Sequence, residues 1–491
     1  MFESAELGHS ITDREYDRKE PKLREALLKA QYDLLQNKSF PVVIVIGGVD
    51  GAGKGETVNI LNEWMDPRHI VTHAFGEMSD EERERPRMWR YWRALPPKGR
   101  IGILFGGWHT EPIVNRVLGR TNDAQLELAT EEIVRFERML ADEGALILKF
   151  WFHLSKKAQK KRLKALEADP KTRWRVTGDD WERFRIYDRF RKVSENALRE
   201  TSTGHAPWIV VEGTDPNYRY LTVGRTLLDA LNKRLAGDKP AVSRPAALPE
   251  SALDGRNVLS SLDYAKRLAR KDYSRQLEKY QGELNLLTRH KKFRQKSIVI
   301  VFEGADAAGK GGSIRRITGA LDARHYEVTP VAAPTQDERA QPYLWRFWRS
   351  LPRRGRVTIF DRSWYGRVLV ERVEKFCSED DWMRAYHEIN DFEEQMTEAG
   401  GIVTKFWLTI TKEEQLRRFR EREKTPFKSF KITPDDWRNR KKWDAYERAA
   451  CDMIDRTSNE LAPWVLVPAN DKYSARIAIL KTLCERIEAA L

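Results

Sequence analysis

The chain has 491 residues, of which 41% are hydrophobic, so it is long and apolar enough for two α/β domains with separate cores. Its net charge of +14 favours a polyanionic partner, such as nucleic acid, an anionic membrane or a phosphate-rich substrate. No segment approaches the roughly 18 consecutive apolar residues of a membrane span, and the first residues lack the layout of a signal peptide. We therefore expect a cytoplasmic protein that does not contact a membrane. Only three cysteines occur and no CxxC pair is present, which argues against a disulfide framework or a cysteine metal site.

The two halves of the sequence repeat each other without a gap over most of their length. Lys54 corresponds to Lys310, an offset of 256 positions. The same offset matches Trp89 to Trp345, Trp92 to Trp348, Trp108 to Trp364, Trp181 to Trp437 and Trp208 to Trp464. A chance match would not keep one register throughout. We expect domains at residues 1–235 and 251–491, joined by a linker at 236–250 that is rich in proline and alanine.

Both copies follow the same order of predicted elements. A charged helical segment precedes a short β-rich apolar run, at 42–46 and 298–302, which is typical of a buried strand. A glycine-rich turn follows, and further apolar runs then alternate with helical patterns, at 101–105 and 357–360, 145–152 and 402–408, and 208–211 and 464–467. This alternation predicts the α/β class, with a parallel sheet covered by helices on both faces in each copy.

A glycine-rich loop, EGADAAGKGGS, follows the first strand of the second copy and precedes a helix. It matches the pattern GxxxxGK, in which backbone N–H groups, the helix dipole and the lysine bind phosphate oxygens. The residues expected to bind phosphate here are Gly304, Ala307, Ala308, Gly309, Lys310, Gly311, Gly312 and Ser313. Ser313 stands two positions later than the hydroxyl of the usual GK[ST] pattern, which puts conventional magnesium ligation in doubt, and Asp306 is a candidate metal ligand or orienting group. The alternative, a glycine-rich turn with a surface lysine, is disfavoured because the loop recurs at 48–54.

A second acid follows the strand at 357–360, where Asp361 and Arg362 stand at the strand end. A P-loop kinase holds magnesium with an acid in such a place, although an isolated aspartate there is often only a turn residue. The first copy has Phe105 and Gly106 at the matching positions. Without this acid it should be unable to neutralise the charge that develops on a transferred phosphoryl group, so we expect turnover in the second copy alone.

Two further segments of the second copy combine aromatic and basic residues. Around Trp345 and Arg346 an aromatic ring could stack on a base while an arginine binds phosphate, but an amphipathic helix that buries the tryptophans explains the pattern equally well. Basic residues that include Lys428 and Lys431 fit a lid that closes over phosphates, and a solvated charged helix is the alternative.

Taken together, the motifs EGADAAGKGG, PYLWRFW, FDRSWYGRVLVERV and APW make the second copy resemble the family-2 polyphosphate kinases over nearly all of residues 277–491. The tandem arrangement with a degenerate first copy resembles the two-domain subclass, the polyphosphate:AMP phosphotransferases. The resemblance implies a thymidylate-kinase-like P-loop fold, dependence on Mg²⁺ with Mn²⁺ as an alternative, and phosphoryl transfer from inorganic polyphosphate to AMP to give ADP.

The same resemblance implies roles for individual residues. It makes Asp306, Lys310, Asp361 and Arg362 the expected catalytic set, with the two aspartates as metal ligands. Three residues of the following segment also match the family, Arg367 and Arg372 as phosphate ligands and Glu371 near the nucleotide. A long linear polyanion as donor would explain the basic charge balance without base-specific contacts to nucleic acid.

Other functions stay open at this level. The shared motifs do not settle whether AMP or a diphosphate such as ADP or GDP is the acceptor. An ATP-dependent nucleotide kinase and a non-catalytic binder of polyanions or nucleic acid are further alternatives, although Asp306 and Asp361 would be out of place on a polyanion-binding surface. A homo-oligomer is possible, and the first copy is expected to be structural or to bind polyphosphate without reacting it.

Overall fold

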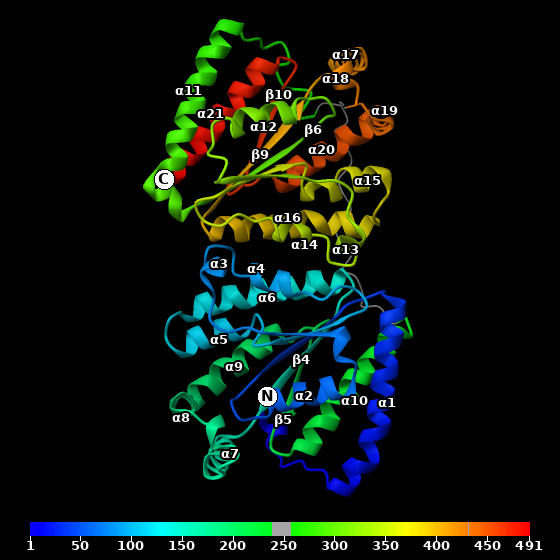
Figure 1. Ribbon diagram of the computed structural model, residues 1–491, viewed down its shortest axis with the longest axis vertical. Coiled ribbons are helices and arrows are strands. Elements are labelled where there is room, and N and C mark those ends of the chain that lie inside the picture. The colour runs from blue at the N-terminus through cyan, green and yellow to red at the C-terminus, as the bar shows by residue number, and fades with distance from the viewer. Residues whose placement is uncertain (238–256, 431) are drawn as a thin grey trace. The chain divides into compact units, whose positions relative to one another are not determined.

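The computed structural model describes residues 1–237, 257–430 and 432–491, and they form two compact units (Figure 1). The first unit is built mainly from residues before 238 and the second mainly from residues after 256. The expected boundaries at 235, 236–250 and 251 stay a prediction, because most of that linker lies outside the described residues.

The first unit has a five-stranded parallel sheet in the order β2-β3-β1-β4-β5. Its strands are β1 (Val42–Gly48), β2 (Ile70–Ala74), β3 (Ile101–Phe105), β4 (Leu146–His153) and β5 (Trp208–Glu212). Its longer helices are α1 (Asp13–Asn37), α2 (Lys54–Trp64), α5 (Thr110–Val117), α6 (Asp123–Asp142), α7 (Lys156–Ala168), α8 (Gly178–Arg185), α9 (Tyr187–Thr201) and α10 (Pro216–Leu235). Of the short helices, α4 (Trp89–Ala94) lies mainly in the first unit, whereas α3 (Asp80–Arg83) belongs to the second.

The second unit repeats this topology, with a parallel sheet in the order β10-β9-β6-β8-β7. Its strands are β6 (Ser297–Gly304), β7 (Tyr326–Pro330), β8 (Val357–Asp361), β9 (Gly401–Thr409) and β10 (Trp464–Pro468). Its helices are α11 (Arg270–Arg289), α12 (Lys310–Thr318), α15 (Val370–Glu374), α16 (Glu379–Glu398), α17 (Lys412–Glu423), α18 (Pro426–Ser429), α19 (Pro434–Lys441), α20 (Trp443–Thr457) and α21 (Lys472–Ala490). Of two more short helices, α14 (Trp345–Trp348) lies mainly in the second unit, whereas α13 (Gln336–Arg339) belongs to the first. The predicted α/β class with a parallel sheet in each copy is confirmed.

The inner strands of each sheet are buried on both faces, which explains why they read as continuous apolar runs, whereas the edge strands β2 and β7 are partly exposed. In the second unit one face packs against α11, α12 and α21 through a core that includes Leu284, Ile317 and Leu483. Helix α16 packs against the sheet at β9 and also contacts α20 (Figure 1). Since all strands are parallel, the loops after β6, β8 and β9 meet at one edge of the sheet, the usual place of ligand sites in such folds.

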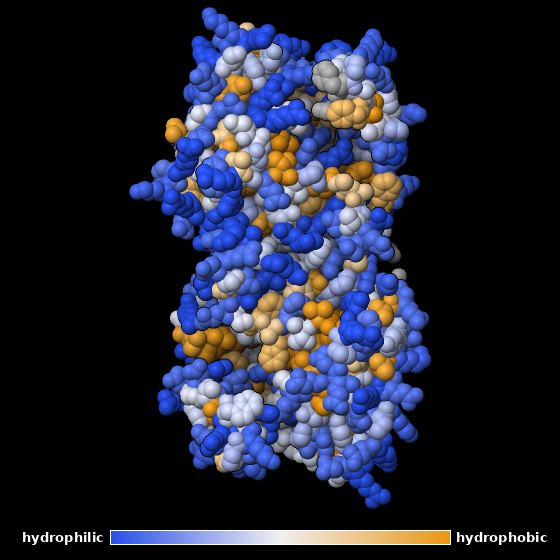
Figure 2. All heavy atoms as spheres, in the orientation of Figure 1, coloured by the Kyte–Doolittle hydropathy of each residue, from blue (hydrophilic) through white to orange (hydrophobic). Residues whose placement is uncertain are grey.

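Hydrophilic residues cover most of the face shown in Figure 2, in keeping with a chain in which 33% of residues are charged. None of the helices in the described residues is both long and apolar enough to cross a membrane. Cys377, Cys451 and Cys484 are free thiols, as the absence of a disulfide pattern predicted.

Candidate active site

The glycine-rich loop of the second unit connects β6 to α12 in a conformation that few side chains permit. Gly304 has φ of 134°, and a Cβ there would lie 2.0 Å from the main-chain oxygen of Leu408 on β9. Ala307 and Gly309 are also left-handed, with φ of 63° and 115°. Non-glycine residues adopt this region only when the surroundings hold them there, often at functional sites. The loop is therefore a fixed cradle, and α12 begins at Lys310.

Lys310 is folded back onto this loop. Its Nζ donates to the carbonyl oxygens of Gly304 at 2.7 Å and Ala305 at 3.3 Å. Burial lowers the pKa of Lys310, and the nearby Arg362 lowers it further, whereas Asp306 and other neighbouring acids act against this shift. The predicted phosphate-binding lysine thus lies near both predicted catalytic acids and the predicted arginine.

The remaining predicted loop residues surround the start of α12. The Ser313 side chain is buried, and its hydroxyl donates to the carbonyl oxygen of Gly309 at 3.4 Å. A Cβ at Gly312 would lie 3.1 Å from the guanidinium of Arg476, whereas nothing lies within 4 Å of the Cβ position at Gly311. Position 311 therefore leaves open space beside the first turn of the helix.

Asp306 connects three elements of the site. Its Oδ1 accepts from Nη2 of Arg362 at 2.9 Å, and its Oδ2 accepts from Nδ2 of Asn439 on α19 at 2.9 Å. Gln415 on α17 donates to its carbonyl oxygen at 3.2 Å. Arg362 has φ of 67°, another left-handed non-glycine residue. The strand-end arginine and Asn439 of α19 thus converge on the Asp306 carboxylate, while Gln415 of α17 holds the main chain of the same residue.

Asp361 ends β8 and pairs in register with Phe302, near the end of β6. The two predicted metal ligands, Asp361 and Asp306, therefore follow neighbouring strands of the sheet. No group of three or more histidine, cysteine, aspartate or glutamate side chains suited to a metal ion occurs in the described part of the chain.

A buried carboxyl group, not anticipated from the sequence, lies directly before the loop. Glu303 is 5% exposed and accepts from Oγ of Ser363 at 2.8 Å. Burial raises the pKa of Glu303, while that hydrogen bond lowers it. A carboxyl group in such a place is expensive to ionise, which is common at functional sites.

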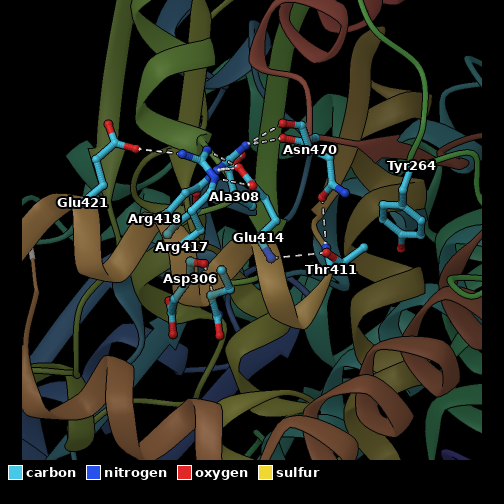
Figure 3. A network of polar contacts seen from close by, with 12 residues as sticks. Tyr264, Asp306, Ala308, Thr411, Glu414, Arg417, Arg418, Glu421 and Asn470 are labelled. Carbon is cyan, nitrogen blue, oxygen red and sulfur yellow. Dashed lines mark hydrogen bonds and ion pairs between the residues drawn. The ribbon is translucent and has the colours of Figure 1, made fainter.

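Arg418 on α17 donates hydrogen bonds to main-chain oxygens of the loop, as Figure 3 shows. Its Nη1 donates to the carbonyl oxygens of Ala307 at 2.9 Å and Ala308 at 3.2 Å, and its Nη2 donates to those of Ala469 and Asn470 at 2.7 and 3.1 Å. Its Nε lies 2.6 Å from Glu414. Because its guanidinium is buried among these partners, Arg418 supports the loop and does not offer its charge to a ligand.

The other predicted phosphate ligands are held by protein partners or lie outside the described residues. Arg367 pairs with Glu371 at 2.9 Å. Arg372 pairs with Asp452 at 2.7 Å and stacks on the ring of Trp382. The side chain of Lys428 and the whole of Lys431 lie outside the described residues.

The predicted nucleotide contacts are not gathered at the loop. Trp345 and Arg346 lie in α14, where Arg346 donates to the carbonyl oxygen of Ala332 at 2.9 Å. Glu371 lies in α15. None of these three residues lines the pocket beside Asp306.

That pocket is a cavity of about 110 Å³ on the lid side of the loop. Glu303, Asp306, Arg362, Trp407, Asn439 and Tyr446 are among its lining residues. Sequence patterns gave no signal for Trp407, Asn439 or Tyr446, because they come from β9, α19 and α20, far from the loop in the chain.

The loop of the first unit has the same backbone course but different partners. Lys54 donates to the carbonyl oxygens of Gly48 at 2.7 Å and Val49 at 2.9 Å, as Lys310 does at the equivalent positions. Asp50 faces Lys54 and Arg183, both at 3.4 Å. Arg183 stands at the position of Asn439, so the first copy neutralises its loop aspartate with a charged group where the second copy uses an amide.

Acid and arginine side chains also fill the phosphate face of this first loop. Glu56, which replaces Gly312, lies 2.8 Å from Arg219 and 3.0 Å from Arg162. The Arg219 guanidinium lies so close to Gly53 that a Cβ there would meet it at 2.2 Å. No comparable group lies within 4 Å of the Cβ position at Gly309 in the second copy.

Comparisons with known proteins agree with this geometry. The family model described as Polyphosphate kinase 2 matches residues 10–239 and 267–491. A protein of Pseudomonas aeruginosa named polyphosphate:AMP phosphotransferase is 58% identical over 491 residues, covering 100% of this chain and 99% of the relative. One of the same name from Acinetobacter johnsonii is 36% identical, with 96% of each chain covered. A crystal structure described as a polyphosphate kinase 2 from Pseudomonas aeruginosa superimposes with a TM-score of 0.90 at 56% identity, covering 100% of this chain and 99% of the other. The chain therefore belongs to the polyphosphate kinase 2 family and carries two copies of its domain.

Proposed function

We propose that the second copy transfers the terminal phosphate of inorganic polyphosphate to AMP, giving ADP. The observation that carries this proposal is the ion pair between Arg362 and Asp306, beside Lys310. This pair joins the end of β8 to the glycine-rich loop, and the first copy, with Gly106 in place of Arg362, cannot form it. The relatives matched over their full length carry the name of this activity. The loop geometry supports a phosphate chain as donor, because its helix N-terminus and glycines suit phosphate oxygens.

Asp361 and Asp306 fit a magnesium ion as the implied cofactor, with manganese as an alternative. They supply carboxylate oxygens next to the phosphate cradle, and magnesium in such enzymes is held by one or two carboxylates together with substrate phosphates. When bound, the metal would neutralise charge on the phosphates. The burial of the Ser313 side chain argues against it as a ligand in this arrangement of the loop.

The chain's own residues account for the rest of an in-line transfer. The Lys310 ammonium would leave the carbonyl oxygens that it now contacts and bind donor phosphate oxygens, while Arg362 stabilises charge on the phosphoryl group in transfer. The phosphate of AMP is already largely ionised near neutral pH, so no strong general base is needed. Arg367 and Arg372 could contribute only by exchanging their present carboxylate partners, Glu371 and Asp452, for phosphate.

The proposed donor also agrees with the charge of the chain. A net charge of +14 suits a long linear polyanion and requires no specific nucleic acid. We place the reaction in the cytoplasm, where AMP is available. A homo-oligomer is compatible with this activity and is not required by it.

The test is to incubate the protein with polyphosphate and Mg²⁺ and, separately, AMP, ADP, GMP and GDP, and to separate the products by ion-exchange chromatography. ADP formed from AMP is the expected product, and replacement of polyphosphate by ATP should abolish it. The matched controls are the Lys310→Ala and Lys54→Ala variants. Product from ADP or GDP but none from AMP would contradict the acceptor, and transfer from ATP alone would contradict the donor.

A further inference from the structure

The cavity beside Asp306 has the walls of a site for a flat ring. Trp407, Trp443, Tyr446 and Leu369 supply aromatic and apolar surface, and Glu447 and Thr409 add polar groups. Trp407 is 8% exposed and has no aromatic partner among the described residues. Asp306 and Arg362 line the same cavity, so a molecule inside it would reach the proposed reacting groups. The established family motifs explain the loop but not this aromatic wall.

In the first unit, a ring from the chain itself lies at the position that corresponds to this cavity. Trp151 and His153 on β4 stand at the positions of Trp407 and Thr409 on β9. The ring of Phe2 lies over both of them, with centroids 4.5 Å from His153 at an interplanar angle of 9° and 6.2 Å from Trp151 at 16°. Phe2 is 1% exposed. A planar six-membered ring therefore stacks on the aromatic wall in the first copy.

Neighbouring charges hold this ring in place. Glu6 lies 2.7 Å from Nε2 of His153, and Glu3 lies 3.3 Å from Arg191 on α9. The second copy has threonine at the position of His153 and Glu447 at the position of Arg191, so neither of these two contacts could form there. The basic groups that bind an acidic segment of the chain are thus replaced by groups that accept hydrogen bonds from a ligand.

In the second unit the segment that precedes α11 lines the cavity instead. Leu259 forms part of its wall, and the hydroxyl of Tyr264 lies 2.9 Å from the carbonyl oxygen of Leu259 and 3.1 Å from Oγ1 of Thr409. A volume of about 110 Å³ stays open beside Trp407. Since a cavity that holds one water needs only about 10–15 Å³, that space suits a small heterocycle better than a single water.

We propose that this cavity binds the nucleoside of the acceptor, with the base stacked on Trp407 and Glu447 accepting a hydrogen bond from the base or the ribose. In the first copy Phe2 occupies the equivalent place, so that copy has no nucleoside site. The inference rests on the proposed function, because it takes the acceptor to be a nucleotide. The acceptor phosphate then extends from the cavity toward Arg362 and Lys310.

Binding is measured by titration calorimetry on the full chain, without polyphosphate, using AMP and adenosine as separate probes. We expect one site per chain. Base stacking on an aromatic side chain is worth about 1–3 kcal/mol. Trp407→Leu should therefore lower the affinity for AMP and for adenosine at least about fivefold. Trp407→Phe should retain most of the affinity because it keeps a ring, and Trp151→Leu in the first unit serves as the matched control that leaves affinity unchanged. Thermal melting confirms that each variant is folded.

The outcomes separate this inference from the proposed function. Unchanged AMP affinity in folded Trp407→Leu, equal losses in the leucine and phenylalanine variants, two sites per chain, or no binding of either probe would each overturn the inference. Turnover of the unmodified protein with AMP and polyphosphate is measured separately. Loss of binding in Trp407→Leu together with no ADP formation by the unmodified protein would support the nucleoside site while contradicting the proposed reaction.

Discussion

Replacing Asn439 with arginine should give the candidate active site the arrangement seen in the first copy, which we predict to be inactive. Asn439 donates from a neutral amide to Asp306 at 2.9 Å, whereas Arg183 brings a charged guanidinium to within 3.4 Å of Asp50. An arginine at position 439 would pair with Asp306 and reduce the negative charge that this carboxylate offers to a metal ion. We therefore expect slower transfer and a higher requirement for Mg²⁺.

The size of this effect follows from the geometry of the first copy. Two unit charges 3.4 Å apart interact by about 5 kcal/mol at an effective dielectric constant of 20. Desolvation and partial exposure cancel much of that energy, which leaves about 1–3 kcal/mol for the new ion pair. A loss of that size corresponds to a rate about 5- to 150-fold lower. Asn439→Ala, which removes only one hydrogen bond, should cost about 0.5–1.5 kcal/mol, or about 2- to 12-fold.

The assay is the initial rate of ADP formation at saturating AMP and polyphosphate, measured across a series of Mg²⁺ concentrations. Arg183→Asn in the first copy is the matched control and should leave both the rate and the Mg²⁺ dependence unchanged. The reasoning fails if Asn439→Arg keeps the rate within about twofold at every Mg²⁺ concentration, or if the control variant loses as much activity as Asn439→Arg.

Three further predictions concern the loop and its surroundings. Lys310→Ala should lower turnover by orders of magnitude through lost stabilisation of the transition state, while Lys54→Ala leaves it nearly intact, and equal losses in ADP formation would contradict this division between the copies. Burial raises the pKa of Glu303, so the folded state holds its proton more tightly than the unfolded state and stability falls as pH rises above about 4.5. Glu303→Gln should therefore raise the thermal midpoint at pH 7 relative to the unmodified protein, and the two midpoints should become equal near pH 4. A difference in midpoint that does not change with pH would show that the cost of ionising Glu303 is not its cause. Gly304→Ala should cost at least about 3 kcal/mol, because the added Cβ would meet a main-chain oxygen of β9 at 2.0 Å, whereas Gly311→Ala, which meets nothing within 4 Å, should melt within about 2 °C of the unmodified protein.

Much of the fold could be predicted because its signals are local. Continuous apolar runs mark strands that are buried on both faces, and the glycine-rich loop carries its phosphate site in one short stretch. The sequence also placed Asp361 correctly at the end of a strand beside that loop. These features depend on neighbouring residues in the chain, so sequence patterns detect them.

The contacts between distant elements could not be predicted in the same way. Asn439 reaches Asp306 across 133 positions of the chain, and Arg418 reaches the carbonyl oxygen of Ala307 across 111. An asparagine on a charged helix and an arginine in a basic run have no pattern that distinguishes them from solvated residues. The stacking of Phe2 on His153 likewise joins two distant parts of one domain, the start of the chain and the end of β4, and only the fold brings them together.

One buried network is kept in both copies, which locates where the first copy changed. In the second copy Glu393 lies 2.7 Å from the Tyr365 hydroxyl and 2.6 Å from Nζ of Lys405. In the first copy Glu137 takes the place of Glu393 and lies 2.7 Å from Nζ of Lys149.

His109 replaces Tyr365 and still lies 2.7 Å from Glu137, so this substitution preserves the network although it stands four positions after Phe105, which replaced the catalytic acid. Removing one partner of such a buried pair costs about 3–5 kcal/mol, since the other charge is left without compensation. The groups of this buried network therefore stay in the first copy, whereas Glu56, Phe105 and Gly106 differ from their counterparts at the loop and the strand end. Such a combination is expected if the first copy is structural, which stays a prediction.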